Sequence, residues 1–321
     1  MIRKSILKSI EDDYITESDL LKKLDITHEH LKDHIVSLKE TGYDIIHDEY
    51  KGYKLLNTPD ILEPFEVKRG LKTEYIANNI HFYENLESTN DTAKKYVEND
   101  APEGTVIIAE KQSAGRSRKN TDWASPEGGI YMTIILRPDV TLVEASKLTI
   151  VAGVSIAKTL HDEFGIDVGI KWPNDILIGD KKICGILTEA VTDFDKVKAV
   201  LLGIGVDVNI EKEDIPDDLQ DIATSVKNEI NTELKRAEIL RVFFKIFEDM
   251  YNHFKEGNFK EIVNEWRRLS TTTGNRVRVY KAGKAIVADA IGVNNEGALI
   301  VELDDGRLEK INSGECYILN E

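Results

Sequence analysis

The chain contains few cysteines, prolines and aromatic residues. Its 321 residues include two cysteines, Cys184 and Cys316, with seven prolines and 7% aromatic residues. Two isolated cysteines exclude a disulfide framework and the paired spacing of a structural zinc site, so the sequence predicts a protein of the reducing cytoplasm. The longest apolar run, 199–206, is far shorter than the roughly 20 residues that cross a bilayer. We therefore expect no membrane partner.

Positive charge is also scarce. The chain holds 42 Lys and Arg residues against 58 Asp and Glu, which gives a formal net charge of -16. This balance argues against a protein that binds nucleic acid through its bulk charge. The apolar content of 41% is enough for substantial cores, and the length allows two or three domains.

The sequence does contain a glycine-hinged cationic loop and a second compact motif. The loop reads Gly-Arg-Ser-Arg at 115–118 and has no apolar residue before 123, so we expect it to be mobile until it closes over an anionic ligand. The run Lys-Trp-Pro-Asn-Asp at 171–175 places a cation, a large ring and a carboxylate close together. Gly185 and Gly-Ile-Gly at 203–205 follow, and they allow a ligand to approach the backbone closely.

With this order and spacing, the region resembles the biotin–protein ligases, which activate biotin with ATP and attach it to a lysine of a biotin carboxyl carrier protein. The resemblance implies biotin and ATP as substrates and Mg²⁺ as the metal. It implies a biotin site made of Ser88, Thr89, Asn90, Gln112, Gly115, Arg116, Ser117, Arg118, Lys182, Gly185, Gly203 and Gly205. It implies an ATP and adenylate site made of Arg116, Arg118, Lys119, Trp123, Lys171, Asn174, Lys182, Asp207 and Asn209. The implied catalytic residues are Lys182, Arg118, Lys171 and Asp175, and Asp175 is also the implied magnesium ligand.

The implied reaction accounts for these residue types. The biotin carboxylate attacks the α-phosphorus of ATP and pyrophosphate leaves, so the protein must bring one anion against another. This task requires cations, backbone amides and positioning, but no covalent nucleophile. Closing the loop would keep water from a bond that hydrolyses easily. Gln112 can donate and accept hydrogen bonds, as the ureido ring of biotin requires.

Four positions depart from the family pattern. The family loop reads Gly-Arg-Gly-Arg-Arg-Gly, and here Ser117, Lys119 and Asn120 replace glycine, arginine and glycine. Asp207 stands where the family usually has asparagine, and an acid there is expected to disfavour phosphates unless it binds magnesium or points away. Simpler explanations also exist for these motifs, namely a charged surface loop, an N-cap at 88–90 and a Trp123 packed in a core.

The apolar pattern predicts an α/β (α+β) chain of three domains. Residues 1–62 have the order helix, turn, helix, hairpin of a winged helix-turn-helix domain. Residues 66–271 are expected to form a mixed sheet with flanking helices of the biotin/lipoate ligase type, with strands at 80–86, 106–110, 130–136, 168–170, 176–178, 184–191 and 199–206 and helices at 90–97, 143–164 and 236–255. Residues 272–321 are expected to form an SH3-like β-barrel with strands at 276–280, 285–293, 298–301 and 316–319.

In one branch of the family the first domain represses the biotin operon as an adenylate-bound dimer. The resemblance therefore implies operator DNA and a second copy of the chain as partners, besides a carrier of the acetyl-CoA or pyruvate carboxylase type. The candidate DNA contacts are Thr27, His28, His30, Lys32, Lys39 and Lys51. However, residues 1–60 carry 9 Lys and Arg against 13 Asp and Glu, a net charge of -4, whereas phosphate contacts normally require a cationic face.

Two alternative functions therefore stay open. One is an enzyme whose winged helix does not bind DNA. The other is a lipoate–protein ligase, which shares the catalytic fold but is disfavoured by the run at 171–175 and by the C-terminal domain. A metal site at His30 and His34 is also disfavoured, because a pair at i, i+4 is incomplete without further ligands.

Overall fold

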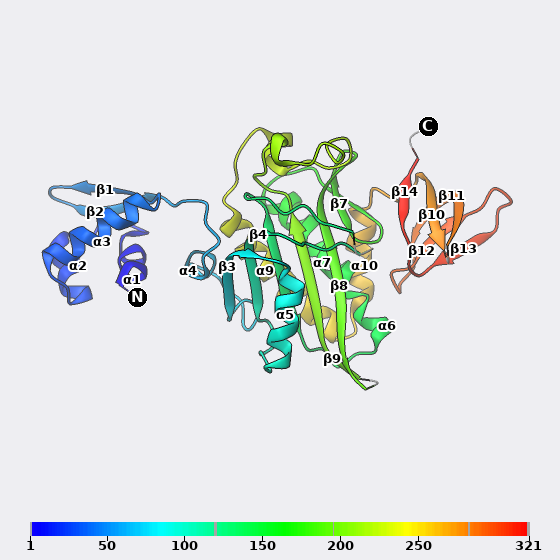
Figure 1. The fold of residues 1–321 in the computed structure, drawn as a ribbon, viewed down its shortest axis with the longest axis horizontal. Helices are drawn as coiled ribbons and strands as arrows, with labels where there is room; N and C mark the ends of the chain where they lie inside the picture. Colours follow the sequence, from blue (N-terminus) through cyan, green and yellow to red (C-terminus); the bar gives the residue numbers. More distant parts are fainter. Residues whose placement is uncertain (1, 119–120, 195, 282, 320–321) are drawn as a thin grey trace. The chain divides into compact units, whose positions relative to one another are not determined.

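The computed structural model describes residues 2–118, 121–194, 196–281 and 283–319. The chain divides into two compact units, Met1–Ile61 and Leu62–Glu321, which Figure 1 colours along the sequence. Among the described residues, none of the helices combines the length and the apolar character needed to span a membrane.

The first unit consists of three helices and a hairpin. They are α1 (Ile2–Ile10), α2 (Glu17–Leu24), α3 (His28–Glu40), β1 (Asp44–Asp48) and β2 (Gly52–Asn57). Thr16 begins α2 by accepting a hydrogen bond from the Asp19 amide, and Thr27 begins α3 by accepting one from the His30 amide. The buried face of α3 carries Leu31, Ile35 and Leu38. Helix α1 is not among the predicted elements, because its nine residues give only a short periodic signal.

A seven-stranded mixed sheet is the centre of the second unit (Figure 1). The strand order is β3-β4-β5-β9-β8-β7-β6, with β3 and β4 parallel and all other neighbours antiparallel. The strands are β3 (Ile80–Leu86), β4 (Val106–Gln112), β5 (Ile130–Leu136), β6 (Gly169–Lys171), β7 (Asp175–Ile178), β8 (Lys181–Asp193) and β9 (Lys196–Val206). The predicted mixed sheet is confirmed, although β8 and β9 extend beyond their apolar stretches because they pair as one long hairpin.

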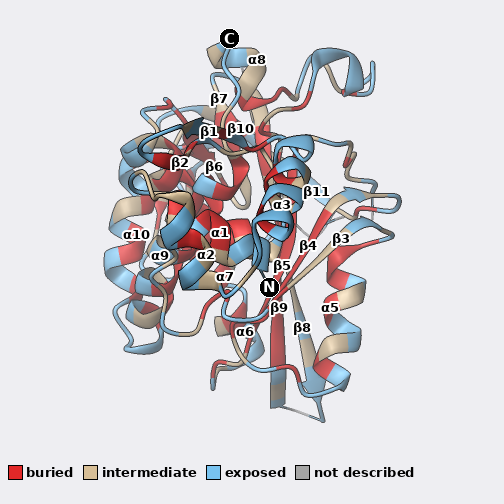
Figure 2. Cartoon of the chain, turned by 90° about the vertical axis from the view of Figure 1, so that its left-hand side faces the viewer, coloured by how far each residue is buried: buried red, intermediate tan, exposed pale blue. Residues whose placement is uncertain are grey.

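The two faces of this sheet bury different cores. All residues of β5 are buried, and successive side chains point to opposite faces of the sheet. The even-numbered residues therefore belong to a large core, whereas Ile135 belongs to a smaller one. The smaller core is closed by Ala93 and Val97 of α5 (Thr89–Glu98). Figure 2 shows β5 and most of β9 buried. The large core is covered by α7 (Leu148–Lys158), α9 (Arg236–Lys255) and α10 (Phe259–Arg268).

The single helix predicted at 143–164 is three segments. They are α6 (Leu142–Ala145), α7 and a π-helical segment at Thr159–Glu163. Thr141 and Glu144 form a capping box around α6, which gives this short helix its own beginning, and α7 starts again after Lys147. Besides α1, the described residues form α4 (Pro64–Val67), α8 (Val226–Ile230) and α10 outside the predicted elements.

The C-terminal part is an antiparallel sheet of order β13-β12-β11-β10-β14. Its strands are β10 (Arg276–Lys281), β11 (Lys284–Val293), β12 (Leu299–Glu302), β13 (Leu308–Ile311) and β14 (Cys316–Ile318), of which β13 is not predicted. Buried Trp172 ties this sheet to the central one. Its amide donates to Thr272 Oγ1 (2.8 Å), and its Nε1 donates to the Gly297 carbonyl (3.1 Å).

Candidate active site

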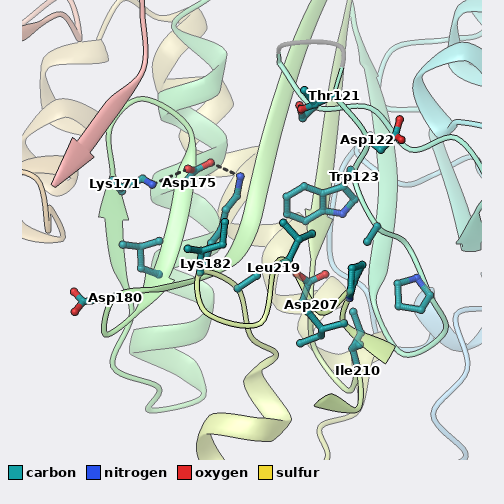
Figure 3. Close-up of a pocket in the computed structure, with 18 of the residues that line it drawn as sticks. Thr121, Asp122, Trp123, Lys171, Asp175, Asp180, Lys182, Asp207, Ile210 and Leu219 are labelled. Atoms are coloured by element: carbon teal, nitrogen blue, oxygen red, sulfur yellow. Dashed lines mark hydrogen bonds and ion pairs between the residues drawn. The ribbon is translucent and has the colours of Figure 1, made fainter. Parts of the chain in front are cut away.

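Two cavities lie side by side in the second unit and share Ser117, Trp123 and Lys182 as lining residues. The larger has a volume of about 530 Å³, within the usual range of small-molecule sites, and the smaller of about 40 Å³. Figure 3 shows the larger cavity with the Trp123 ring near its centre.

The smaller cavity brings together almost all of the predicted biotin-binding residues. It is lined by Ser88, Thr89, Asn90, Gln112, Arg116, Ser117, Arg118, Lys182, Gly185, Gly203 and Gly205. Gly115 lies just outside this lining and is required there, because a Cβ on it would come within 2.7 Å of Ser125 Oγ. Residues as far apart in sequence as Ser88 and Gly205 thus converge, because the end of β4, the start of α5, the first half of β8 and the last residues of β9 all contribute to this cavity.

Gln112 organises one wall of the smaller cavity. It is the last residue of β4, which extends two residues beyond the predicted strand at 106–110, and its Oε1 accepts hydrogen bonds from the Thr89 amide (2.9 Å) and hydroxyl (3.1 Å). Its Nε2 donates to Ser125 Oγ (2.9 Å). Ser88 caps α5 by accepting from the Asp91 amide, so the expected cap and the cavity wall are formed by the same segment.

Polar residues that the sequence does not single out hold the lining residues Thr89 and Asn90 in place. Thr133 Oγ1 lies 2.5 Å from Asn90 Oδ1 and 2.9 Å from Thr89 Oγ1, and Asn90 Nδ2 donates to Glu189 Oε2 (2.6 Å). A threonine within the otherwise apolar run 130–136 was the available signal for Thr133. Glu189 gives no such signal, since its position depends on the pairing of β8 with β9.

Three glycines line the smaller cavity. Gly185 on β8 pairs with Gly205 on β9, and Gly203 lies two residues away on the same face. A Cβ on Gly185 or Gly205 would lie 2.7 or 2.6 Å from the Trp123 ring, and one on Gly203 would lie 2.3 Å from Asn90 Oδ1. The absence of side chains therefore lets Trp123 and Asn90 rest directly on the backbone.

Two lysines and one carboxylate form a charged cluster in the larger cavity (Figure 3). Asp175 binds Lys171 (3.2 Å) and Lys182 (2.7 Å), and the Lys182 ammonium lies 4.8 Å from the centre of the Trp123 ring. The β6–β7 hairpin creates this arrangement, since it pairs residue 171 with residue 175. The cations expected to meet phosphates are thus held together by one acid.

Asp207 faces the larger cavity and differs from the other acids there. Its Oδ1 is buried and has no hydrogen-bond partner among the described residues. Burial raises the pKa of Asp207 well above its usual range, and the nearby Lys182 opposes this effect. Asn209, predicted as a nucleotide contact, instead exchanges hydrogen bonds with the backbone of Leu234 (2.8 and 3.0 Å) and lines neither cavity.

The two arginines of the loop at 115–118 contact different partners. Arg118 Nη1 donates to Asn174 Oδ1 and to the Gly314 carbonyl, each at 3.3 Å, and burial lowers the pKa of Arg118. Arg116 binds Asp91 and Glu189 instead. Ser117, which replaces a family glycine, pairs with Thr121 through both its amide (2.8 Å) and its hydroxyl (2.5 Å). Lys119 and Asn120 lie outside the described residues.

The DNA-contact candidates belong to the first unit. His30, Lys32 and Lys39 are exposed on α3, Thr27 caps this helix, and His28 binds Glu17. Lys51 in the hairpin turn lies 5.4 Å from the centre of the Tyr14 ring. Among the described residues, no cluster of three or more His, Cys, Asp or Glu side chains has the geometry of a metal site.

Comparison with known proteins identifies the family. The sequence model of the biotin/lipoate A/B protein ligase family matches residues 82–209, and that of the biotin protein ligase C-terminal domain matches 272–319. The bifunctional ligase/repressor BirA of Bacillus subtilis is 37% identical over 286 residues, which cover 89% of this chain and 88% of that protein. The chain belongs to the biotin protein ligase family.

Two further relatives of this ligase are informative. The bifunctional ligase/repressor BirA of Escherichia coli is 24% identical over 286 residues, 89% of this chain and 87% of that protein. The biotin protein ligase from Aquifex aeolicus, solved in complex with biotin and ATP, is 27% identical with a TM-score of 0.66 over 76% of this chain and 100% of that chain. The predicted family, the mixed central sheet and the C-terminal antiparallel β domain of the ligase are thereby confirmed.

Proposed function

We propose that this ligase forms biotinyl-5′-AMP across the two cavities and transfers biotin to a lysine of a carboxylase carrier domain. The biotin head group would occupy the smaller cavity and the nucleotide the larger one. The observation that carries this proposal is the position of Lys182, which lines both cavities and therefore lies where a carboxylate and an α-phosphate would meet. Relatives named for biotin–[acetyl-CoA-carboxylase] ligase activity, such as that of Paracoccus denitrificans at 30% identity, support the carrier as the acceptor.

The first step joins two anions. A carboxylate oxygen of biotin attacks the α-phosphorus, the bond to the bridging oxygen of pyrophosphate breaks, and pyrophosphate leaves with the electron pair. Lys182 and Lys171 would exchange their ion pairs with Asp175 for contacts with phosphate oxygens as negative charge develops on these oxygens. Arg118 would neutralise the adenylate from the loop side, where its guanidinium already contacts Asn174 and the Gly314 carbonyl.

The second step is aminolysis of the mixed anhydride. The ε-amine of the carrier lysine attacks the biotinyl carbonyl carbon, AMP leaves, and the attacking nitrogen releases a proton. Until the carrier arrives, the anhydride must be kept from water. Ser117 and Trp123 border both cavities, so closure at this point would exclude solvent from both halves of the adenylate.

The carboxylates of the larger cavity fit a magnesium ion. Mg²⁺ is usually held by one or two carboxylates together with substrate phosphates, and it offsets the charge of these phosphates. Asp175 is the predicted ligand, but both of its oxygens are engaged by lysines. Asp207 offers a buried oxygen that none of the described residues binds, so we include it beside Asp175 as a candidate ligand.

Calorimetric titration with biotin and with lipoate tests the proposed substrate. The proposal predicts saturable binding of biotin at one site per chain and no binding of lipoate at the same concentrations. Binding of lipoate with biotin inert would favour the lipoate ligase alternative.

We further propose that the ligase acts as a biotin-dependent repressor. The support comes from the names of the Bacillus subtilis and Escherichia coli relatives and from the helix and hairpin order of the first unit, which is that of a winged helix-turn-helix domain. Operator DNA and an adenylate-bound homodimer follow from this proposal. The net charge of -4 in residues 1–60 favours the alternative of an enzyme alone.

We also propose that the chain has three domains. We assign residues 1–62 to the winged helix, 66–271 to the catalytic domain and 272–321 to an SH3-like barrel. The five-stranded antiparallel sheet of the last part supports the barrel assignment. The free, buried thiols of Cys184 and Cys316 support action in the reducing cytoplasm.

A further inference from the structure

Arg116 is bound by two carboxylates that come from different elements. Its Nη2 lies 2.7 Å from Asp91 Oδ1 and 3.1 Å from Glu189 Oε2, and its Nη1 lies 3.3 Å from Glu189 Oε1. The planar guanidinium thus makes a fork-to-fork pair with Glu189 and a shorter single contact with Asp91. Such paired contacts fix the direction of an arginine side chain as well as its position.

Both acids are held in place. Asp91 lies in the first turn of α5, where its amide donates to the cap residue Ser88. Glu189 lies on β8 and accepts a hydrogen bond of 2.6 Å from Asn90, which is itself buried against Thr133. The two carboxylates therefore form a preorganised receptor for a cation, anchored on a helix and on a strand rather than on the loop.

The base of the loop is closed by backbone hydrogen bonds. The Trp123 amide donates to the Gly115 carbonyl (2.8 Å), and the Gln112 amide donates to the Ser125 carbonyl (3.2 Å). Arg116 follows directly on this base and lines the smaller cavity. Fixing its side chain therefore fixes the direction in which the chain leaves the base and passes over that cavity.

We propose that Asp91 and Glu189 are positioning residues that hold Arg116 and thereby order the first half of the loop before biotin binds. In an ordered loop, biotin does not have to provide the free energy of loop ordering, so its apparent affinity is higher. The effect on affinity rests on the proposed biotin site, whereas the ordering of the loop does not. Glu189 also fixes Asn90, so Asp91 is the residue whose loss tests the receptor alone.

Limited proteolysis tests the ordering without any ligand. Trypsin cleavage after Arg118 is timed by mass spectrometry in the full chain without biotin or ATP. We expect Asp91→Asn to be cleaved about two- to fivefold faster, the range for loss of one partly exposed charged contact, with a smaller effect at high salt. The control is Asp100→Asn, an exposed acid that pairs with Lys198 on the surface at 3.5 Å and should leave the rate unchanged.

A double-variant cycle separates the contact from general loosening of α5. Arg116→Gln should speed cleavage after Arg118 to a similar degree, and Asp91→Asn combined with Arg116→Gln should add little to it. The proposal would be overturned if Asp91→Asn were cleaved at the wild-type rate, or if the effects of the two substitutions on the cleavage rate were fully additive. Asp91→Glu retains the charge and should restore most of the protection.

Biotin titration of the same variants completes the test. Asp91→Asn should weaken biotin binding by about the factor seen in proteolysis. If wild-type protein bound no biotin, the proposed function would fail whatever the protease result. If wild-type protein bound biotin and Asp91→Asn bound it equally well, the positioning role would fail and the proposed function would stand.

Discussion

The Lys182 ammonium meets three different groups at the junction of the two cavities. It binds the Asp175 carboxylate at 2.7 Å, lies over the Trp123 ring, and opposes the raised pKa of Asp207. An ammonium is a compact, mobile charge, so it can leave one acid for a phosphate without a change in the backbone. This residue is therefore the point at which the proposed chemistry depends on a single side chain.

Replacing Lys182 with alanine should stop adenylate formation while the fold persists. Removal of one group that stabilises developing charge typically costs a factor of about 10² to 10³ in kcat. The rate of biotin-dependent AMP and pyrophosphate release measures this loss. Lys181→Ala is the matched control, because this neighbour lines neither cavity. Wild-type rates in Lys182→Ala would remove the residue from the mechanism.

Asp207 makes the stability of the ligase depend on pH. Because folding raises the pKa of Asp207, the folded protein binds this proton more tightly than the unfolded chain does. The resulting stabilisation is present below the unfolded pKa of about 4 and is lost as pH rises through the folded pKa. Asp207→Asn should therefore raise the free energy of unfolding at pH 8 by about 1–3 kcal/mol, and by less near pH 4.

Thermal or denaturant unfolding at the two pH values checks this prediction. Asp180→Asn removes an exposed acid of the same cavity and should change stability by less than about 0.5 kcal/mol. A less stable Asp207→Asn variant at pH 8 would mean that the carboxylate is ionised and well compensated by Lys182.

At the scale of elements, the β8–β9 pair positions Trp123. Two glycines opposite each other in register leave room for the ring, and neither strand alone creates that space. Gly205→Ala would place a methyl group 2.6 Å from the ring nitrogen, so the ring must move. We expect a loss of stability of about 1–3 kcal/mol, weaker ATP binding and an altered tryptophan emission spectrum.

Gly153→Ala is the control for this change. Its Cβ would find its nearest neighbour at 3.7 Å, an ordinary contact, and helical glycine-to-alanine changes are neutral or stabilising by up to about 1 kcal/mol. Unchanged emission and ATP affinity in Gly205→Ala would contradict the assigned place of Trp123.

Apolar patterning predicted the elements better than it predicted their ends. The central strands were predictable because each is a short apolar run with clear turns, whereas β13 is largely exposed and lacks such a run. Residues 143–164 predict a single helix because apolar residues continue across its breaks, whereas the capping box at Thr141 gives α6 a beginning of its own. Thr133 and Glu189 contact residues that line the smaller cavity only because of strand register, which a single sequence does not specify.

At the scale of the whole molecule, the acidic balance of the first unit limits how it could bind DNA. DNA binding by the first unit would rely on few cations, so we predict that a gel shift with the protein's own upstream DNA, biotin and ATP appears at low salt and weakens steeply between about 50 and 200 mM. Lys32→Ala should weaken it and reduce the salt slope by about 1. Lys95→Ala, exposed on α5, should not. No shift at any salt concentration would favour the enzyme-only alternative.

Exchange of labelled pyrophosphate into ATP tests the central claim most directly, because it reports the reversible joining of biotin to AMP without needing a carrier protein. Wild-type enzyme should catalyse exchange that depends on biotin, saturates with it and is not supported by lipoate. Lys182→Ala should lower this rate at least about a hundredfold, while Lys181→Ala should leave it unchanged. Exchange that proceeds without biotin, or that is equal in the two variants, would contradict the account.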